Sequence, residues 1–99
     1  MEKQMESIIR QEVKRVFQEY ADWDTDIESW DTEWNLDSWN DHLQESLSEH
    51  HGINLNINNP DDAAKLTEYA AQAHSLWSTA CKEYLRALRA LKSEILKMI

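Results

Sequence analysis

The side chains with the clearest chemical character in this sequence are carboxylates, and they are concentrated in one segment. Residues 21–62 contain twelve Asp or Glu and no Lys or Arg, whereas residues 1–20 contain four acids and four bases. On a helix, carboxylates one turn apart lie about 5–6 Å from each other. This spacing is similar in scale to that of phosphates along a nucleic acid strand, so a basic nucleic-acid-binding groove would be attracted to such a surface.

The predicted partner-binding surface combines two helical rows of these acids with two tryptophans. A helix over this segment would carry one row of Asp24, Glu28 and Asp31 and a second row of Asp22, Asp26, Glu33 and Asp37. Trp30 and Trp34 would lie at the edge of the rows and add binding energy, because Trp is over-represented among interface hot spots. The alternative is that the acids keep a Trp-rich module soluble while the Trp side chains form its core.

This pattern predicts a non-enzymatic acidic interaction protein that inhibits or adapts a basic protein partner, such as a nucleic-acid-binding one. In size and charge the chain resembles the small acidic inhibitors and DNA mimics that phages and mobile elements encode. An oligomeric helical assembly or adaptor subunit is the main alternative.

The same segment resembles the twelve-residue calcium loop of EF-hands. Acids occupy positions one, three, five and twelve of the run 22–33, namely Asp22, Asp24, Asp26 and Glu33. Ile27 stands where that loop has Gly, and a β-branched residue resists the backbone conformation of the turn. A helix that turns its Trp side chains inward explains Ile27 without a metal. We therefore predict no metal site and keep a calcium-binding switch as an alternative function.

Residues 36–39, Leu-Asp-Ser-Trp, resemble the attachment site of acyl or peptidyl carrier proteins. Those proteins are also small, acidic and helical, and they present a Ser for phosphopantetheine before their second helix. Aligning Leu43, Leu47 and Gly52 with that family without gaps places Asp37, not Ser38, at the attachment position. A carrier-like module is a further alternative, and we predict no cofactor.

The remaining reactive side chains form no recognisable catalytic pattern. His42, His50, His51 and His74 do not fall at a metal-binding spacing, and we expect His50 and His51 to be surface residues near a helix end. Cys81 has no neighbouring His in the sequence, and one Gly cannot build a phosphate-binding loop. We expect no enzyme activity.

Composition narrows the classes of partner and location. The 99 residues have a formal net charge of −9 and a sequence pI near 4.7. Direct binding to nucleic acid or to an anionic membrane needs clustered Lys and Arg, so we expect neither. One Cys fits a reducing compartment, and no run approaches the roughly 18 apolar residues of a membrane span. These features predict a cytoplasmic protein.

Apolar spacing predicts an all-α protein with one helical domain over residues 1–99. Eight large apolar residues from Ile9 to Trp34 follow one another at alternating spacings of four and three, which indicates a helix over about 2–35, with a break near 22–25 as the alternative. A second helix is expected over 38–51, with Asp37 or Ser38 as its cap and Gly52 at its end. Residues 53–57 alternate apolar and polar, typical of either an extended crossover or an edge strand that pairs with another protein.

The strongest local signal is Asn59-Pro60-Asp61-Asp62, which is typical of a helix start. No breaker follows, so a very long helix is expected over 61–99. The fold class is an elongated helical hairpin or a small three- to four-helix bundle.

One face of this last helix is basic and carries Lys82, Arg86, Arg89 and Lys97. It is either a solvated face or a secondary docking site, through Lys82, Arg86 and Arg89, for an acidic surface such as residues 21–62 of a second copy. Five Trp residues exceed what one hairpin would comfortably bury, which predicts a homo-oligomer or an obligate partner.

Overall fold

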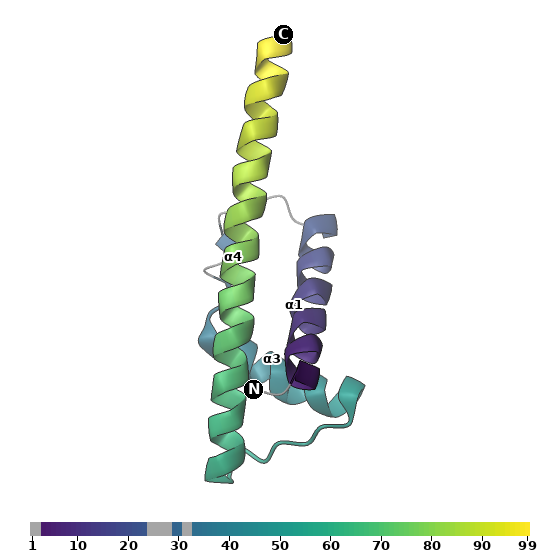
Figure 1. Cartoon of the computed structure of the whole chain (residues 1–99), viewed down its shortest axis with the longest axis vertical. Coiled ribbons are helices and arrows are strands. Elements are labelled where there is room, and N and C mark those ends of the chain that lie inside the picture. Colours follow the sequence, from purple (N-terminus) through teal and green to yellow (C-terminus); the bar gives the residue numbers. More distant parts are fainter. Residues whose placement is uncertain (1–2, 24–28, 31–32) are drawn as a thin grey trace.

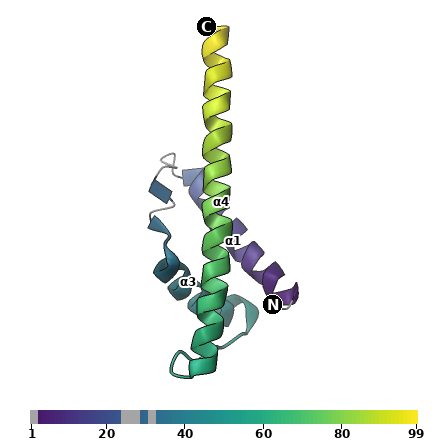
Figure 2. The ribbon, with the colours of Figure 1, turned by 60° about the vertical axis from the view of Figure 1, so that its left-hand side comes forward.

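The computed structural model describes residues 3–23, 29–30 and 33–99, which contain three long helices (Figure 1). They are α1 (Lys3–Trp23), α3 (Leu36–His51) and α4 (Pro60–Met98). Helices α1 and α3 pack against the first half of α4, which continues beyond both (Figures 1 and 2). The all-α prediction with a very long last helix is therefore confirmed.

The first helix is shorter than the apolar spacing indicates. It ends at Trp23, and Ser29, Trp30 and Glu33 have helical backbone again. Residues 13 apart on a straight helix are separated by about 20 Å. The ring centroids of Phe17 and Trp30 are only 5.7 Å apart, so Trp30 packs beside α1 instead of continuing along its axis. One continuous helix over 2–35 is excluded, and residues 24–28 lie outside the described residues.

Side-chain caps set the bounds of α3 and α4. Asn35, not Asp37 or Ser38, caps α3, because its Oδ1 accepts a hydrogen bond from the Ser38 amide at 3.0 Å. This starts the helix at Leu36, two residues earlier than expected. Gly52 ends α3 with a left-handed φ of 64°, a conformation that costs glycine least. Asn59 caps α4 by accepting from the amides of Asp61 and Asp62.

Residues 53–57 connect α3 to α4 without forming a strand. Ile53 and Leu55 are half-buried against the core, whereas Ile57 is exposed. Of the two alternatives that the sequence left open, the segment is therefore the extended crossover. Two of its three aliphatic side chains rest on the helices.

The core lies where α1 and α3 meet the first half of α4, and it is rich in aromatic rings. Trp30, Trp39 and Trp77 have no exposed surface, and Phe17 and Tyr20 of α1 contact Trp30 and Trp77 edge-on. Edge-to-face contacts of this kind add specificity to the burial of apolar surface. A single chain thus buries at least three of its five Trp side chains, so these rings do not by themselves require a partner.

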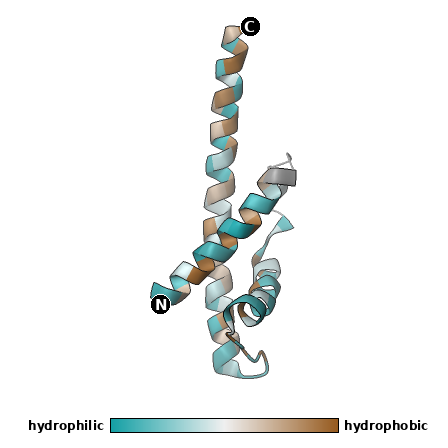
Figure 3. Cartoon of the chain, turned by 90° about the vertical axis from the view of Figure 1, so that its right-hand side faces the viewer, coloured by the Kyte–Doolittle hydropathy of each residue, from teal (hydrophilic) through white to brown (hydrophobic). Residues whose placement is uncertain are grey.

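The molecule measures 59 × 23 × 22 Å because the second half of α4 projects past the other helices (Figures 1 and 2). Figure 3 shows hydrophobic residues along this projecting part as well as inside the body. Within the described residues, none of the helices holds an apolar stretch long enough to cross a membrane.

Candidate functional site

A row of four carboxylates runs along the outer face of α3. Asp37, Asp41, Glu45 and Glu49 follow one another at a spacing of four, and all four are exposed. At 1.5 Å rise per residue the row is about 18 Å long, with about 6 Å between neighbours. We call these four residues the α3 acidic ridge.

The ridge faces solvent because the opposite side of α3 is apolar. Trp39, Leu43 and Leu47 have no exposed surface and anchor the helix on the core. With 3.6 residues per turn, positions two residues away from these anchors point away from the core. The scaffold that holds the ridge is therefore the packed core itself.

A polar groove of about 440 Å³ lies beside the ridge. Asp41, Glu45 and Glu49 form one wall, and Asn54 and Leu55 of the crossover form the other. The Ser48 hydroxyl donates to Asn54 Oδ1 at 2.7 Å, and the Ile53 amide donates to the Leu47 carbonyl at 2.9 Å, which fixes the crossover against α3. Carboxylates on one wall make this groove suited to a Lys or Arg side chain.

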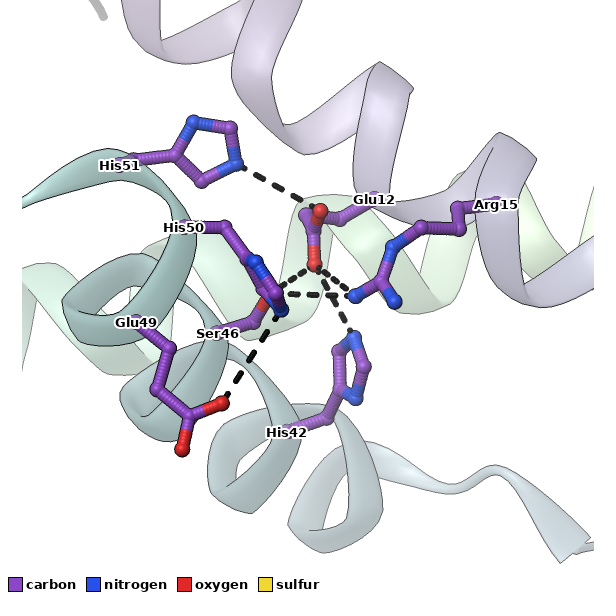
Figure 4. Close-up of polar contacts among 7 residues, drawn as sticks. All are labelled: Glu12, Arg15, His42, Ser46, Glu49, His50 and His51. Atoms are coloured by element: carbon purple, nitrogen blue, oxygen red, sulfur yellow. Dashed lines mark hydrogen bonds and ion pairs between the residues drawn. The ribbon is translucent and has the colours of Figure 1, made fainter.

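Glu12 of α1 is a buried carboxylate surrounded by donors from α1 and α3 (Figure 4). Its Oε1 accepts from Arg15 Nη2 at 2.7 Å and from the Ser46 hydroxyl, and lies 3.3 Å from His42 Nε2. Its Oε2 lies 3.5 Å from His51 Nε2. We call these five residues the Glu12 cluster, and it joins the middle of α1 to the middle and the end of α3.

The donors decide the charge of Glu12. Burial alone raises the pKa of this carboxyl, but the hydrogen bonds from Arg15, Ser46 and His51 and the positive charge of Arg15 together lower the pKa to about 2. The hydrogen bond with Glu12 raises the pKa of Arg15 in turn. Burial lowers the pKa of His42, although the Glu12 charge opposes this shift. At neutral pH the cluster therefore holds a charged Glu12 beside a neutral His42.

The Glu12 cluster is suited to fastening helices rather than to moving protons. A carboxyl with a pKa near 2 is a weak base at neutral pH, and both of its oxygens already have partners. No group of three His, Cys, Asp or Glu side chains among the described residues is arranged to hold a metal ion.

The sequence-predicted acidic site lies partly outside the described residues. The side chain of Asp22 is outside them, and so are four whole residues of the site: Asp24, Asp26, Glu28 and Asp31. Glu33 and Asp37 are both exposed, and Asp37 is the first residue of the α3 acidic ridge. Glu33 accepts from the Ser29 hydroxyl at 3.5 Å, and the rest of the calcium-loop pattern is outside the described residues.

The two predicted Trp contacts lie in the core and at its edge. Trp30 has no exposed surface, so its ring is not presented to a partner by the folded chain. Trp34 is half-buried, and its Nε1 donates to the Tyr20 hydroxyl at 2.8 Å. Ser38, the carrier-like serine, donates its hydroxyl to the Glu33 carbonyl and to Asn35 Oδ1 within the cap of α3.

The basic face of α4 is exposed as expected. Lys82, Arg86 and Arg89 all lie on the solvent side of the helix. Arg86 pairs with Glu83 at 3.3 Å in its own helix. A surface pair of this kind is worth little, so Arg86 is still able to meet another charge.

Sequence reasoning missed most of the α3 acidic ridge and all of the Glu12 cluster. The spacing of four from Asp37 through Asp41 and Glu45 to Glu49 is a signal that could have indicated the ridge. The cluster gives no such signal, because its members come from two helices about 30 residues apart in the sequence.

Comparisons of the chain with protein-family models, with curated proteins and with solved structures found no match.

Proposed function

We propose that this chain is a non-enzymatic acidic interaction protein that binds a basic protein partner and thereby inhibits or adapts it. The observation that carries the proposal is the α3 acidic ridge, with four exposed carboxylates in one row on a packed helix. The whole segment from residue 21 to residue 62 contains no Lys or Arg that would neutralise them.

Electrostatics supports a basic partner over an apolar one. Charges of one sign on a rigid face add to a local potential that attracts the opposite sign and speeds association. The groove between the ridge and Leu55 offers a place for a basic side chain beside the row of carboxylates. Binding of this type fixes register and partner choice more than it adds raw affinity.

A nucleic-acid-binding protein is the proposed class of partner. The axial spacing of about 6 Å along the ridge is of the same order as the axial spacing of about 3.4 Å between phosphates on one DNA strand. A surface of this kind would occupy the basic groove of such a partner and exclude its nucleic acid, as an inhibitor of the DNA-mimic type does.

Affinity capture from the source cells, followed by titration of the purified captured protein, tests the proposal. The Asp41→Asn/Glu45→Gln/Glu49→Gln variant should bind about tenfold more weakly, because three favourable charge contacts of a few tenths of a kcal/mol each are lost. The matched control is Glu68→Gln/Glu83→Gln/Glu94→Gln, which removes the same charge from exposed positions of α4 and should bind like the wild type.

Two outcomes would contradict this function. Equal affinity of the ridge variant and the wild type would remove the ridge from the interaction. Failure of duplex DNA to compete for a captured partner would remove the nucleic-acid-binding class while leaving an acidic contact in place.

An oligomeric assembly or adaptor subunit is the second candidate function. The projecting half of α4 favours it, since its apolar side chains are exposed in a single chain.

A further inference from the structure

The projecting half of α4 carries an exposed apolar stripe. Every residue from Arg86 to Met98 is exposed, and the side chains of Leu91, Ile95 and Met98 are 55%, 48% and 84% exposed. Figure 3 shows hydrophobic positions along α4 beyond the point where α1 crosses it. Exposed aliphatic residues that line one side of a helix mark an interaction surface.

The stripe continues the core face of the same helix. Its members follow one another at alternating spacings of four and three from the core to the tip, in the order Trp77, Cys81, Tyr84, Leu88, Leu91, Ile95 and Met98. Phe17 and Trp30 cover Tyr84 with ring centroids 5.4 Å and 6.0 Å away. Beyond Tyr84 the side chains of this face are exposed, from 38% at Leu88 to 84% at Met98, and the average period of 3.5 residues is that of a coiled-coil seam.

The exposed part of the stripe is complementary to itself. The spacings from Leu88 through Leu91 and Ile95 to Met98 are three, four and three, which read the same in both directions. Two antiparallel copies would therefore pair Leu88 with Met98 of the second copy and Leu91 with Ile95 of the second copy. An antiparallel two-fold contact needs this property, because residue i of one copy meets residue j of the other and j meets i.

The body of the protein selects the antiparallel orientation. Helix α1 occupies the stripe face up to Tyr84. A parallel partner would bring a second α1 to the same level, between two α4 helices whose axes must be about 8–10 Å apart to pack. An antiparallel partner avoids this clash, since its own body lies beyond the tip of the first α4.

We propose that two copies of this chain pair antiparallel through the α4 stripe formed by Leu88, Leu91, Ile95 and Met98. This interface is separate from the α3 acidic ridge and does not depend on the proposed function. The overlap is about 15 Å long, shorter than a standard interface, so the dissociation constant is expected to be about 10 µM or weaker.

Salt distinguishes this contact from binding through the ridge. Residues 84–99 contain four bases and one acid, so the paired segments carry charge of the same sign. Screening weakens this repulsion and leaves the apolar contact intact, so added salt should strengthen dimerisation. Association through the acidic ridge should respond to salt in the opposite direction.

Sedimentation equilibrium of the full chain tests the pairing. The wild type should shift from monomer to dimer with concentration, and more completely at about 0.5 M salt than at about 0.05 M. The Leu91→Asp/Ile95→Asp variant should stay monomeric. The control Leu96→Asp/Ala90→Asp adds the same charge at exposed positions off the stripe of the same helix, and it should dimerise like the wild type.

Cysteine pairing tests the orientation. An oxidised mixture of Leu91→Cys and Ile95→Cys chains should form the mixed disulfide, because these positions face each other in the antiparallel pair. Cys81 is buried and should not compete. A wild type that stays monomeric, equal loss of dimer in both Asp variants, or a disulfide between two Leu91→Cys chains would each overturn the proposal.

Discussion

Glu12 shows how a single charged side chain is tolerated between two helices. It is 3% exposed, and an unpartnered carboxylate at such a site would destabilise the fold strongly. Donors from Arg15, His42, Ser46 and His51 surround both of its oxygens, so the charge is kept and satisfied. The same contacts hold α3, and thus its acidic ridge, at a fixed place on α1.

Replacing Glu12 should weaken the fold. Glu12→Gln keeps the shape but loses the charge-assisted bonds from Arg15 and Ser46, so the free energy of unfolding should fall by about 1–3 kcal/mol. Urea unfolding followed by circular dichroism measures this loss. The control Glu19→Gln, on the exposed side of α1, should change the free energy of unfolding by less than about 0.5 kcal/mol.

Acid should destabilise the protein in two ranges of pH. The pKa of His42 is lower in the folded chain than its ordinary value of 6.5, so the unfolded chain binds this proton first and stability falls as the pH drops below 6.5. The pKa of Glu12 falls from 4.5 to about 2 on folding, so its contribution is present above pH 4.5 and is lost as the pH approaches 2.

Urea midpoints measured from pH 7.5 down to pH 3 check this pH dependence. His42→Gln should reduce the pH dependence of the midpoint in the upper pH range, and Glu12→Gln should reduce it in the lower pH range. The contribution lost by Glu12 is on the order of 3 kcal/mol, from a pKa shift of this size. If both variants had the same pH profile of the urea midpoint as the wild type, protonation of the Glu12 cluster would not be coupled to folding.

At the scale of elements, the ends of helices are set by local contacts that a sequence displays directly. Asn59 and Pro60 begin α4 and Gly52 ends α3, as their residue types indicate. The end of α1 is different, because Trp30 has the spacing of a helix continued from Tyr20, yet its ring centroid lies 5.5 Å from that of Tyr20, too close for one continuous helix. Apolar spacing tells which residues are buried, but two segments that pack on one core give the same pattern as one helix.

The candidate site, like the helices, was predictable from the sequence only in part. The acidic segment is evident from composition, and Asp37, one of the predicted partner-binding residues, is exposed. The Glu12 cluster depends on the packing of α1 on α3, a long-range arrangement that one sequence does not reveal.

The cap of α4 allows a matched test at this scale. Asn59→Ala removes the acceptor for the amides of Asp61 and Asp62, which should lower the free energy of unfolding by about 1 kcal/mol. Asn58→Ala is the control, because Asn58 contributes its backbone amide, not a cap, to the preceding turn. Thermal unfolding of both variants measures the difference, and equal midpoints would mean that α4 does not depend on this cap.

At the scale of the whole molecule, charge is divided between the body and the tip of α4. Residues 84–99 are net basic, whereas the segment 21–62 is acidic throughout. The acidic ridge and the apolar tip lie on different parts of an elongated molecule, so a basic partner and a second copy could bind at the same time (Figure 1). The opposite salt responses of the two contacts make them separable in one set of experiments.

The most direct test of the account is the association rate constant of the captured basic partner, measured at increasing salt for the wild type, the ridge variant and the α4 control. Charges at the rim of an interface act mainly on this rate and on its salt dependence. The account predicts a fast, strongly salt-dependent association for the wild type and the control, and a slower, flatter one for Asp41→Asn/Glu45→Gln/Glu49→Gln. Identical rate constants for all three proteins at every salt concentration would contradict it.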